Sequence, residues 1–272
     1  MESKEELQVY LQEIEDWEND QKGLFFWEKL GRLPFKLLDK ITPKFIQEKI
    51  GILVNELGSY IQTGGKYLIN EQTIIKKIQK STVNFDLQTI NDIGKLPIKE
   101  MNIISDQLKK ERVKFATAQG ATTGFGGIFT LVVDIPLVLG NALKTLQEIA
   151  IIHGYDPKDK LERVFIVKCL QFASADIVGK EAILKELANM NGKTNSSEEM
   201  ISQLKGWQEV FFTYRDQFGW KKLFQMIPIA GMLFGAIANK GMIKDVSEAG
   251  IMLYRKRRIQ DRLQEIDVTL EN

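Results

Sequence analysis

Apolar residues recur every three or four positions through most of the chain, which is the spacing of amphipathic helices. The pattern and its flanking cap residues predict helices over the following ranges: 3–19, 43–62, 70–80, from Pro97 through Arg112, 135–152, 157–174, from Asp176 to Gly192, from Ser196 to about 215, and about 242–263. The stretch 81–94 is weakly patterned and is predicted to be a connection. We therefore predict an all-α fold, a single multi-helix globular domain of about 9–11 helices.

Three local motifs predict where helices begin or end. Thr42-Pro43 and Asp156-Pro157 each place a capping oxygen before a proline, which favours helix starts at 43 and 157. Ser196-x-x-Glu199 has the pattern of a capping box. Gly241 is expected to end the apolar segment 226–239 before the last helix begins.

The stretch 114–156 combines small residues with a long apolar run. Small residues recur at helical spacing here and in 226–239. They are Ala116, Gly120, Gly124 and Gly127 in the first segment, where Gly126 lies beside Gly127, and Gly231 and Gly235 in the second. Such spacing removes side-chain bulk from one stripe of a helix, so that two backbones approach closely. We expect the two segments to pack together and the fold to be built around them.

Asp134 lies two residues before Pro136, inside the apolar run. Its carboxylate suits the N-terminus of a helix over 135–152, so the stretch is expected to be two helices meeting at Asp134. A carboxylate in the middle of a bilayer is costly, which disfavours one membrane span. Three alternatives stay open at this point: a bilayer span, a hairpin inserted into a membrane, and a buried core hairpin.

Composition narrows the class of protein. The 272 residues carry 37 basic and 36 acidic side chains, and this balance gives no argument for nucleic-acid binding. The single cysteine, Cys169, forms no internal disulfide and is typical of a reducing compartment. Residues 1–20 are acidic and polar, unlike a signal peptide. We expect a cytoplasmic protein.

Most catalytic and cofactor motifs are missing from the sequence. The single histidine, His153, excludes a two-histidine metal site, and we expect it as a cation in the last turn of its helix. Gly124 to Gly127 lack the lysine of a phosphate-binding loop and the third glycine of a dinucleotide fingerprint. Cys169 lies among apolar residues and is expected to be an inert core thiol. We therefore predict no metal and no cofactor.

Three polar residues stand out against apolar surroundings: Asp134, Glu148 and Asn239. Glu148 follows Leu146 and precedes Ile149 on the helix 135–152, so it is expected to be partly buried and to need a partner. A structural ion pair or network is one interpretation. The other is an enzyme with a buried carboxylate and amide site, although we assign no catalytic residue and favour a non-enzymatic protein.

Two segments are candidates for a membrane surface. Residues 22–49 interleave aromatic and basic side chains, among them Phe25, Trp27, Lys29 and Arg32. The run Arg255-Lys256-Arg257-Arg258 places four cations around one helical turn. Both patterns suit anionic headgroups, while core helices and a solvated helix face are the alternatives. We expect an amphipathic appendage over 1–40 and a helical domain over 41–272.

The chain resembles the EcsC protein family. The resemblance spans roughly residues 40–260 and rests on these motifs: Gly120-Ala121-x-x-Gly124-x-Gly126-Gly127, Asp134-x-Pro136, Gln147-Glu148-Ile149-Ala150, Gly154-Tyr155-Asp156, Ile227-Pro228-x-x-Gly231-x-x-x-Gly235 and Ala238-Asn239. It implies a bacterial, mostly helical cytoplasmic protein with a membrane connection, since the family is named from a gene beside an ABC exporter. It supplies no catalytic residues.

Four functional hypotheses follow. The first is a non-enzymatic protein on the inner face of the cell membrane, with anionic lipid or an ABC transporter subunit as its partner. The second is a binding protein for a lipid or other apolar ligand, in a pocket lined by Gly120, Gly124, Gly126, Gly127, Asp134, Glu148, Gly231, Gly235 and Asn239. The third is the enzyme with a buried polar site, and the fourth is a scaffold for another protein.

Overall fold

The computed structural model describes residues 2–20, 43–82, 85–123, 135–174, 177–190 and 239–271. These residues form nine α-helices and one short 3₁₀ helix, with no strand among them, which confirms the all-α prediction. The elements are α1 (Lys4–Asp20), α4 (Pro43–Thr63), η1 (Gly65–Tyr67), α5 (Glu71–Ser81), α6 (Ile90–Gly94), α7 (Ile98–Thr123), α8 (Ile135–Ile152), α9 (Lys160–Ser174), α10 (Ile177–Met190) and α14 (Asn239–Glu271).

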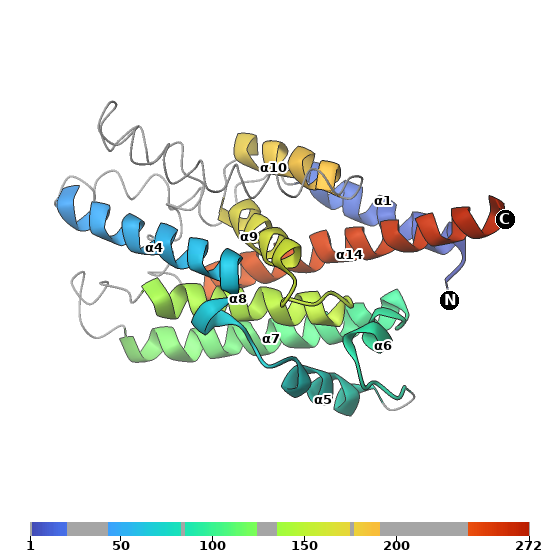
Figure 1. The fold of residues 1–272 in the computed structure, drawn as a ribbon, viewed down its shortest axis with the longest axis horizontal. Helices are drawn as coiled ribbons and strands as arrows, with labels where there is room; N and C mark the ends of the chain where they lie inside the picture. Colours follow the sequence, from blue (N-terminus) through green and yellow to red (C-terminus); the bar gives the residue numbers. More distant parts are fainter. Residues whose placement is uncertain are drawn as a thin grey trace.

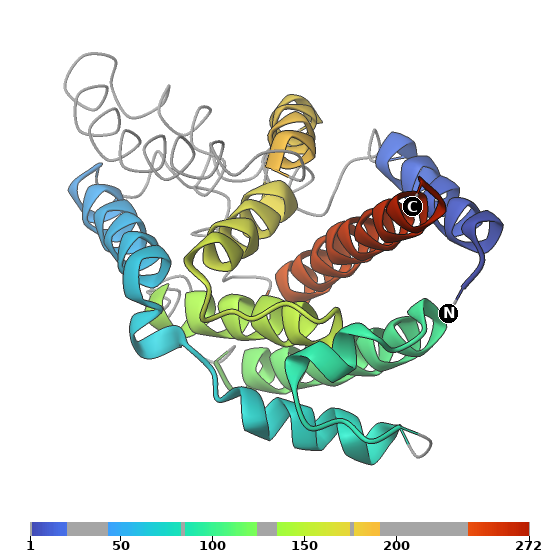
Figure 2. The ribbon, with the colours of Figure 1, turned by 45° about the vertical axis from the view of Figure 1, so that its right-hand side comes forward.

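Helix α14 is central to the arrangement. It packs against α7, α8, α9 and α1, and it runs along the long axis of the molecule (Figure 1). Helices α7 and α8 lie side by side beneath it, with α5 outside them, while α4 and α10 lie on the other side (Figure 2). The two chain ends are neighbours, because Lys4 forms an ion pair with Asp267 at 2.5 Å.

Helices α8 and α9 supply much of the core. From Ala142 to Ile152 every residue of α8 except Lys144 is buried, and the same holds for all of α9 from Glu162 to Ala173. Each large aliphatic side chain removed from water contributes about 1.5–3 kcal/mol to folding. The helices predicted at 43, 70, 97 and 135 are found where the apolar pattern placed them.

The predicted connection 81–94 was wrong in part, because it contains α6. This helix begins with a capping box: the backbone N–H of Asp92 donates to the Thr89 hydroxyl at 3.2 Å, and the Thr89 N–H donates to the Asp92 carboxylate at 3.0 Å. Five residues are too few to show a helical apolar period, so the pattern carried little signal.

The predicted start of α9 at Pro157 was also wrong. The Asp156 carboxylate accepts from the N–H of Lys158 at 2.9 Å and closes a turn instead of capping a helix. The helix begins at Lys160, after Asp159, whose carboxylate accepts from the N–H of Leu161 at 2.9 Å. Aspartate serves a turn and a cap equally well, so the motif alone does not separate the two.

Gly241 does not end a helix as predicted, because α14 continues through it from Asn239 to Glu271. Tertiary packing stabilises the helix against the cost of its glycines. Gly250 has a packing role, since a Cβ there would lie 2.6 Å from Cδ2 of Leu146. Helices α14 and α8 therefore approach each other closely at Gly250.

Candidate functional site

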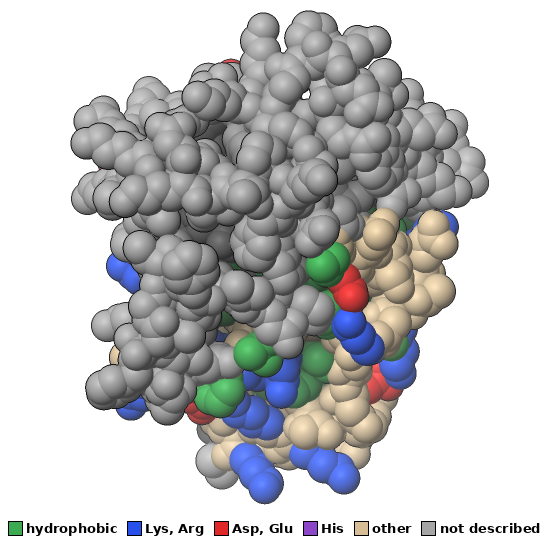
Figure 3. Space-filling model, turned by 90° about the vertical axis from the view of Figure 1, so that its left-hand side faces the viewer, with side chains coloured by type: hydrophobic (Ala, Val, Ile, Leu, Met, Phe, Trp, Pro, Cys, Tyr) green, Lys and Arg blue, Asp and Glu red, His purple; other side chains and the backbone are tan. Residues whose placement is uncertain are grey.

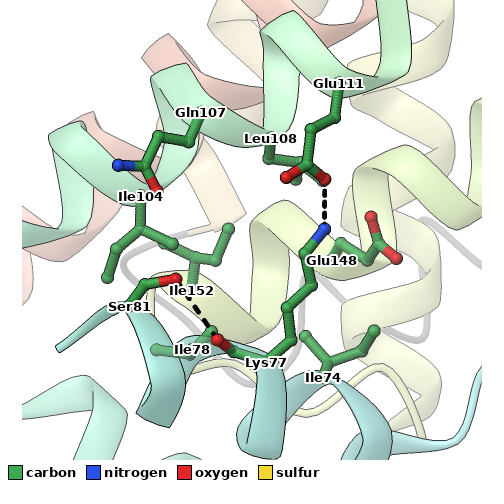
Figure 4. Close-up of a pocket in the computed structure, with 10 residues that line it drawn as sticks. All are labelled: Ile74, Lys77, Ile78, Ser81, Ile104, Gln107, Leu108, Glu111, Glu148 and Ile152. Atoms are coloured by element: carbon green, nitrogen blue, oxygen red, sulfur yellow. Dashed lines mark hydrogen bonds and ion pairs between the residues drawn. The ribbon is translucent and has the colours of Figure 1, made fainter. Parts of the chain in front are cut away.

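A groove between α5, α7 and α8 contains Glu148, the described member of the three buried polar candidates (Figure 4). Lys77 of α5 and Glu111 of α7 point toward each other across it and form an ion pair. The groove is lined by Ile74, Lys77, Ile78, Ser81, Ile104, Gln107, Leu108, Glu111, Glu148 and Ile152. Its free space is about 30 Å³, which is enough for a water molecule and too little for an acyl chain.

Glu148 is buried, as expected, and its partner is Arg112 of α7. The guanidinium binds the carboxylate through both of its oxygens, with Nε of Arg112 3.0 Å from Oε2. This forked geometry is the strongest form of an arginine–carboxylate pair. Glu148 therefore has an ordinary structural partner, and the pair joins α7 to α8.

The other predicted members of this site are not placed. Gly124, Gly126, Gly127, Asp134, Gly231 and Gly235 lie outside the described residues. Gly120 and Asn239 belong to described helices, but their surroundings are not described. The pocket between small-residue helices and the grouping of Asp134, Glu148 and Asn239 stay predictions. Within the described ranges, no cluster of three or more His, Cys, Asp or Glu side chains could hold a metal ion.

The first half of the basic run pairs with the N-terminal helix. Arg255 Nη2 lies 2.5 Å from a carboxylate oxygen of Glu13, and its guanidinium stands over the ring of Tyr10 at 4.9 Å. Lys256 Nζ lies 2.7 Å from Glu18. Both cations are thus engaged by acidic residues more than two hundred positions away in the sequence.

The second half of the run points into the core. Arg257 binds Glu162 of α9 at 2.8 Å and lies over the ring of Tyr155 at 4.0 Å. Arg258 Nε donates to the backbone carbonyl of His153 at 2.7 Å, at the end of α8. The alternative of a solvated helix face is corrected, because all four side chains are buried or half-buried against partners. A role of this run at a membrane surface stays a prediction.

These contacts belong to a buried polar centre where α8, α9 and α14 meet. The hydroxyl of Tyr254 donates to Glu162, and the ring of Tyr254 lies 4.8 Å from that of Phe165 and 6.0 Å from that of His153. Burial raises the pKa of the Glu162 carboxyl, and Arg257 opposes that shift. Because this carboxylate accepts from two donors on α14, the centre ties α9 to α14.

His153 differs from its prediction in charge. Its ring is fully buried, and burial, helped by three nearby arginines, lowers its pKa to about 4. The neutral ring contacts the carbonyl of Ile149 through Nδ1 at 2.8 Å, while Nε2 is buried without a hydrogen bond. The cation at this helix end is Arg258 instead. Burial also raises the pKa of Cys169, as expected for an inert thiol.

The aromatic and basic segment 22–49 was the other candidate for a membrane surface. Phe25, Trp27, Lys29 and Arg32 lie outside the described residues. Among the helices that the structure does describe, none has both the length and the apolar composition that a bilayer crossing requires.

Comparison with known proteins agrees with the resemblance to the EcsC protein family that the sequence motifs indicated. The model of the EcsC protein family matches residues 8–259. The chain belongs to the EcsC protein family. It is 55% identical over 270 residues to the uncharacterized protein YdbA of Bacillus subtilis (strain 168), covering 99% of both chains, and 28% identical over 191 residues to protein EcsC of the same organism, covering 70% of this chain and 78% of that one. No solved structure matches the chain.

The EcsC motif Gln147-Glu148 has a structural explanation. Beside Glu148, the side chain of Gln147 is fully buried and bonds the backbone at η1. Its amide donates to the carbonyl of Tyr67 at 2.9 Å and its oxygen accepts from the N–H of Ile69 at 3.2 Å. Two adjacent polar residues therefore hold α8 to different neighbours.

The EcsC motif Gly154-Tyr155 also serves packing. Gly154 has φ +80°, and a Cβ there would lie 2.4 Å from Cα of Gly94, so a side chain has no room. The ring of Tyr155 faces the guanidinium groups of Arg257 and Arg258, and its hydroxyl donates to Asp261 at 2.7 Å. The motif marks the point where the end of α8 meets α6 and α14.

The sequence reading missed Glu162 and Tyr254. A signal for Glu162 existed, because it lies three residues before Phe165 and seven before Cys169, on the apolar stripe of its helix. A charged residue on such a stripe is a candidate for a buried pair. No sequence spacing links it to Tyr254, 92 positions away.

Proposed function

We propose that this EcsC-family protein is non-enzymatic and associates peripherally with the cytoplasmic face of the cell membrane. The supporting observation is a pair of exposed apolar side chains: Phe115 near the end of α7 is 55% exposed, and Leu137 near the start of α8 is 50% exposed. The Thr123 end of α7 and the Ile135 end of α8 lie at the same end of the molecule (Figure 1). Phe115 lies between Arg112 and that end of α7, and Leu137 lies between Glu148 and that end of α8, where Arg112 and Glu148 join the two helices.

Basic side chains accompany this apolar pair. Lys110, Lys114 and Lys144 are exposed on α7 and α8, and none of them forms an ion pair within the described ranges. Figure 3 views the molecule from the left-hand side of Figure 1, and on its described part hydrophobic and basic side chains lie beside one another, with a few acidic ones among them. Rings and aliphatic groups flanked by cations suit the interface of an anionic bilayer, and each such lysine contributes about 1 kcal/mol to binding.

The other functional hypotheses have less support. Two grooves on the described part of the chain have about 30 and 60 Å³ of free space, which does not favour binding of an acyl chain in either of them. A pocket elsewhere, and an ABC transporter subunit as partner, stay predictions. Vesicles made of lipid alone contain no transporter. Binding to them would therefore indicate direct contact with lipid and not attachment to a transporter subunit.

Flotation of the full chain with anionic and neutral vesicles tests the proposal. We expect the wild type to float with anionic vesicles, and Phe115→Gln/Leu137→Gln to bind about thirtyfold more weakly, since each half-exposed side chain contributes about 1 kcal/mol. Val9→Gln/Ile103→Gln is the matched control, because Val9 and Ile103 are similarly exposed on α1 and on the distal part of α7. This control should bind as the wild type does.

Two results would count against the proposal. The first is failure of the wild type to bind anionic vesicles at any protein concentration. The second is equal loss of binding in the Phe115/Leu137 variant and its control, which would indicate nonspecific adhesion. Neutralising Lys110, Lys114 and Lys144 to Gln should weaken binding at low salt and have little effect at high salt.

A further inference from the structure

Helix α1 is attached to the rest of the described structure chiefly through one neighbour, α14 (Figures 1 and 2). It is strongly acidic, since Lys4–Asp20 contains seven carboxylates and one lysine. The remaining contacts are few: the Glu2 carboxylate accepts from the N–H of Ile98 at 2.5 Å, and the ring of Trp17 lies 5.7 Å from that of Phe172.

Charge complementarity runs along the whole α1–α14 contact. Beside the Arg255–Glu13 and Lys256–Glu18 pairs, Arg262 of α14 lies 2.7 Å from Glu2. Three cations of α14 thus take their carboxylates from residues 2–18. Without α1, this face of α14 would present three cations that have lost these partners.

Apolar anchors give the contact a helical register. Leu7 and Ile14, one heptad apart, are almost completely buried. Trp17 is partly buried and donates its indole N–H to Glu248 of α14 at 3.3 Å. Helix α1 therefore meets α14 with apolar side chains spaced seven and three residues apart, at Leu7, Ile14 and Trp17, and with carboxylates beside them.

The connection between α1 and the rest of the chain is long. Twenty-two residues, 21–42, separate Asp20 from Pro43 in the sequence. The Glu13 side chain is 53% exposed, so its pair with Arg255 is screened by salt. An exposed pair of this kind contributes little to the attachment of α1.

We propose that the face of α14 beneath α1 is an interaction surface for an acidic amphipathic helix of a partner protein, and that α1 occupies it until that helix replaces α1. This mode is the insertion of a helix into a complementary groove. The spaced apolar anchors favour a helix over a lipid surface. The proposal does not rest on membrane binding, because it uses the contact between α1 and α14, whereas the membrane proposal uses exposed residues of α7 and α8.

A labelled peptide of residues 2–20 is the probe, since its sequence fits the surface in this structure. It is titrated into three full-length proteins: the wild type, Glu13→Lys/Glu18→Lys, and the control Glu15→Lys/Asp16→Lys. Glu15 and Asp16 are exposed and form no ion pair with α14. We expect at least tenfold tighter binding to the Glu13/Glu18 variant than to the wild type or control, because its own α1 competes less well.

Hydrogen exchange of the wild type provides a measurement that does not depend on a variant. Saturating peptide should accelerate amide exchange in α1 and leave α8 and α9 protected. A peptide carrying both Glu→Lys changes should have no effect. The same exchange pattern with anionic vesicles in place of peptide would overturn the choice of a helix as partner.

Two further outcomes would overturn the proposal. One is the absence of peptide binding to all three proteins at millimolar concentration, or equal binding of the charge-reversed peptide. The other is a wild-type dimer that exchanges α1 between copies, because a second copy would then be the occupant. Gel filtration with light scattering over a range of protein concentrations identifies that dimer.

Discussion

Helices α8 and α14 both pass through the core, yet they are buried by different means. Helix α8 presents apolar side chains such as Leu143, Leu146 and Ile149 to its neighbours. Helix α14 is rich in charged residues, and Arg255 and Arg257 are buried or half-buried beside aliphatic ones. For α8, burial is favourable by itself, whereas for α14 it depends on partners supplied by other helices.

This difference teaches that charge along a helix does not place the helix at the surface. Arginine tolerates burial when its donors meet carboxylates or carbonyl groups, because the pairing offsets the loss of hydration. Three arginines donate hydrogen bonds to backbone carbonyl groups at or just after helix ends. Arg163 donates to the carbonyls of Ile61 and Gln62, Arg258 to those of His153 and Gly154, and Arg262 to those of Gly94 and Leu96.

Removing one partner of the buried centre should break this arrangement most severely. Arg257→Met leaves the Glu162 carboxylate buried without its cation, and we expect the free energy of unfolding to fall by about 3–5 kcal/mol. Chemical denaturation measures this loss. Leu146→Ala on α8 should cost a similar amount, about 2–5 kcal/mol, through an empty cavity.

The double variant Glu162→Leu/Arg257→Met separates the two mechanisms. Replacing both charges by apolar groups should recover most of the stability lost in Arg257→Met, because no unpaired charge remains. A cost below about 1 kcal/mol for Arg257→Met alone would show that the pair does not hold α14, contrary to the comparison.

Acid should weaken the junction of α8 and α14 through His153. Burial lowers the pKa of His153 to about 4 from its ordinary 6.5, so its stabilising contribution is complete above pH 6.5 and is lost as the pH falls toward 4. We expect the wild type to lose about 3 kcal/mol more than His153→Gln over this range. Denaturation curves at several pH values measure the difference.

Asp245 of α14 acts with the opposite sign. Burial raises its pKa to about 6 from 3.8, so its contribution is present below pH 3.8 and is lost as the pH rises through 6. The free energy of unfolding should therefore fall more steeply with acid in Asp245→Asn than in the wild type, because the variant lacks this opposing titration. An identical pH dependence in the wild type and His153→Gln would contradict the role of the buried ring.

The smallest effect is expected for an exposed ion pair. Lys77 and Glu111 bridge α5 and α7 with about half of each side chain exposed, so Lys77→Ala should lower the free energy of unfolding by less than about 1 kcal/mol. Thermal unfolding detects such a change, with Lys76→Ala as the neighbouring control. A loss above about 2 kcal/mol would show that an exposed ion pair in this fold can contribute as much to the free energy of unfolding as a buried one.

Much of the fold was predictable from local pattern. The start at Pro43, the helix 135–152 and the buried, partnered state of Glu148 follow from caps and apolar spacing. The short α6 and the start of α9 did not, because five residues show no period and an aspartate before a proline suits a turn as well as a cap.

The candidate site was predictable only as a set of residues that need partners. Glu148 lies 36 positions from Arg112, and Arg255 lies 242 positions from Glu13, so neither pairing leaves a trace in sequence spacing. The neutral state of His153 likewise depends on how completely α14 covers it. Membrane association and the pocket between small-residue helices stay predictions.

The sequence by itself determined the helical class of the protein and the approximate ranges of α4, α5, α7 and α8, because a period of 3.6 residues depends on one helix alone. Only the tertiary structure decided what becomes of the charged residues. The sequence around a helical lysine or arginine does not show whether its side chain faces water, lipid or a carboxylate. The run from Arg255 to Arg258 packs against the rest of the molecule because α1, α8 and α9 bring carboxylates and carbonyl groups to it.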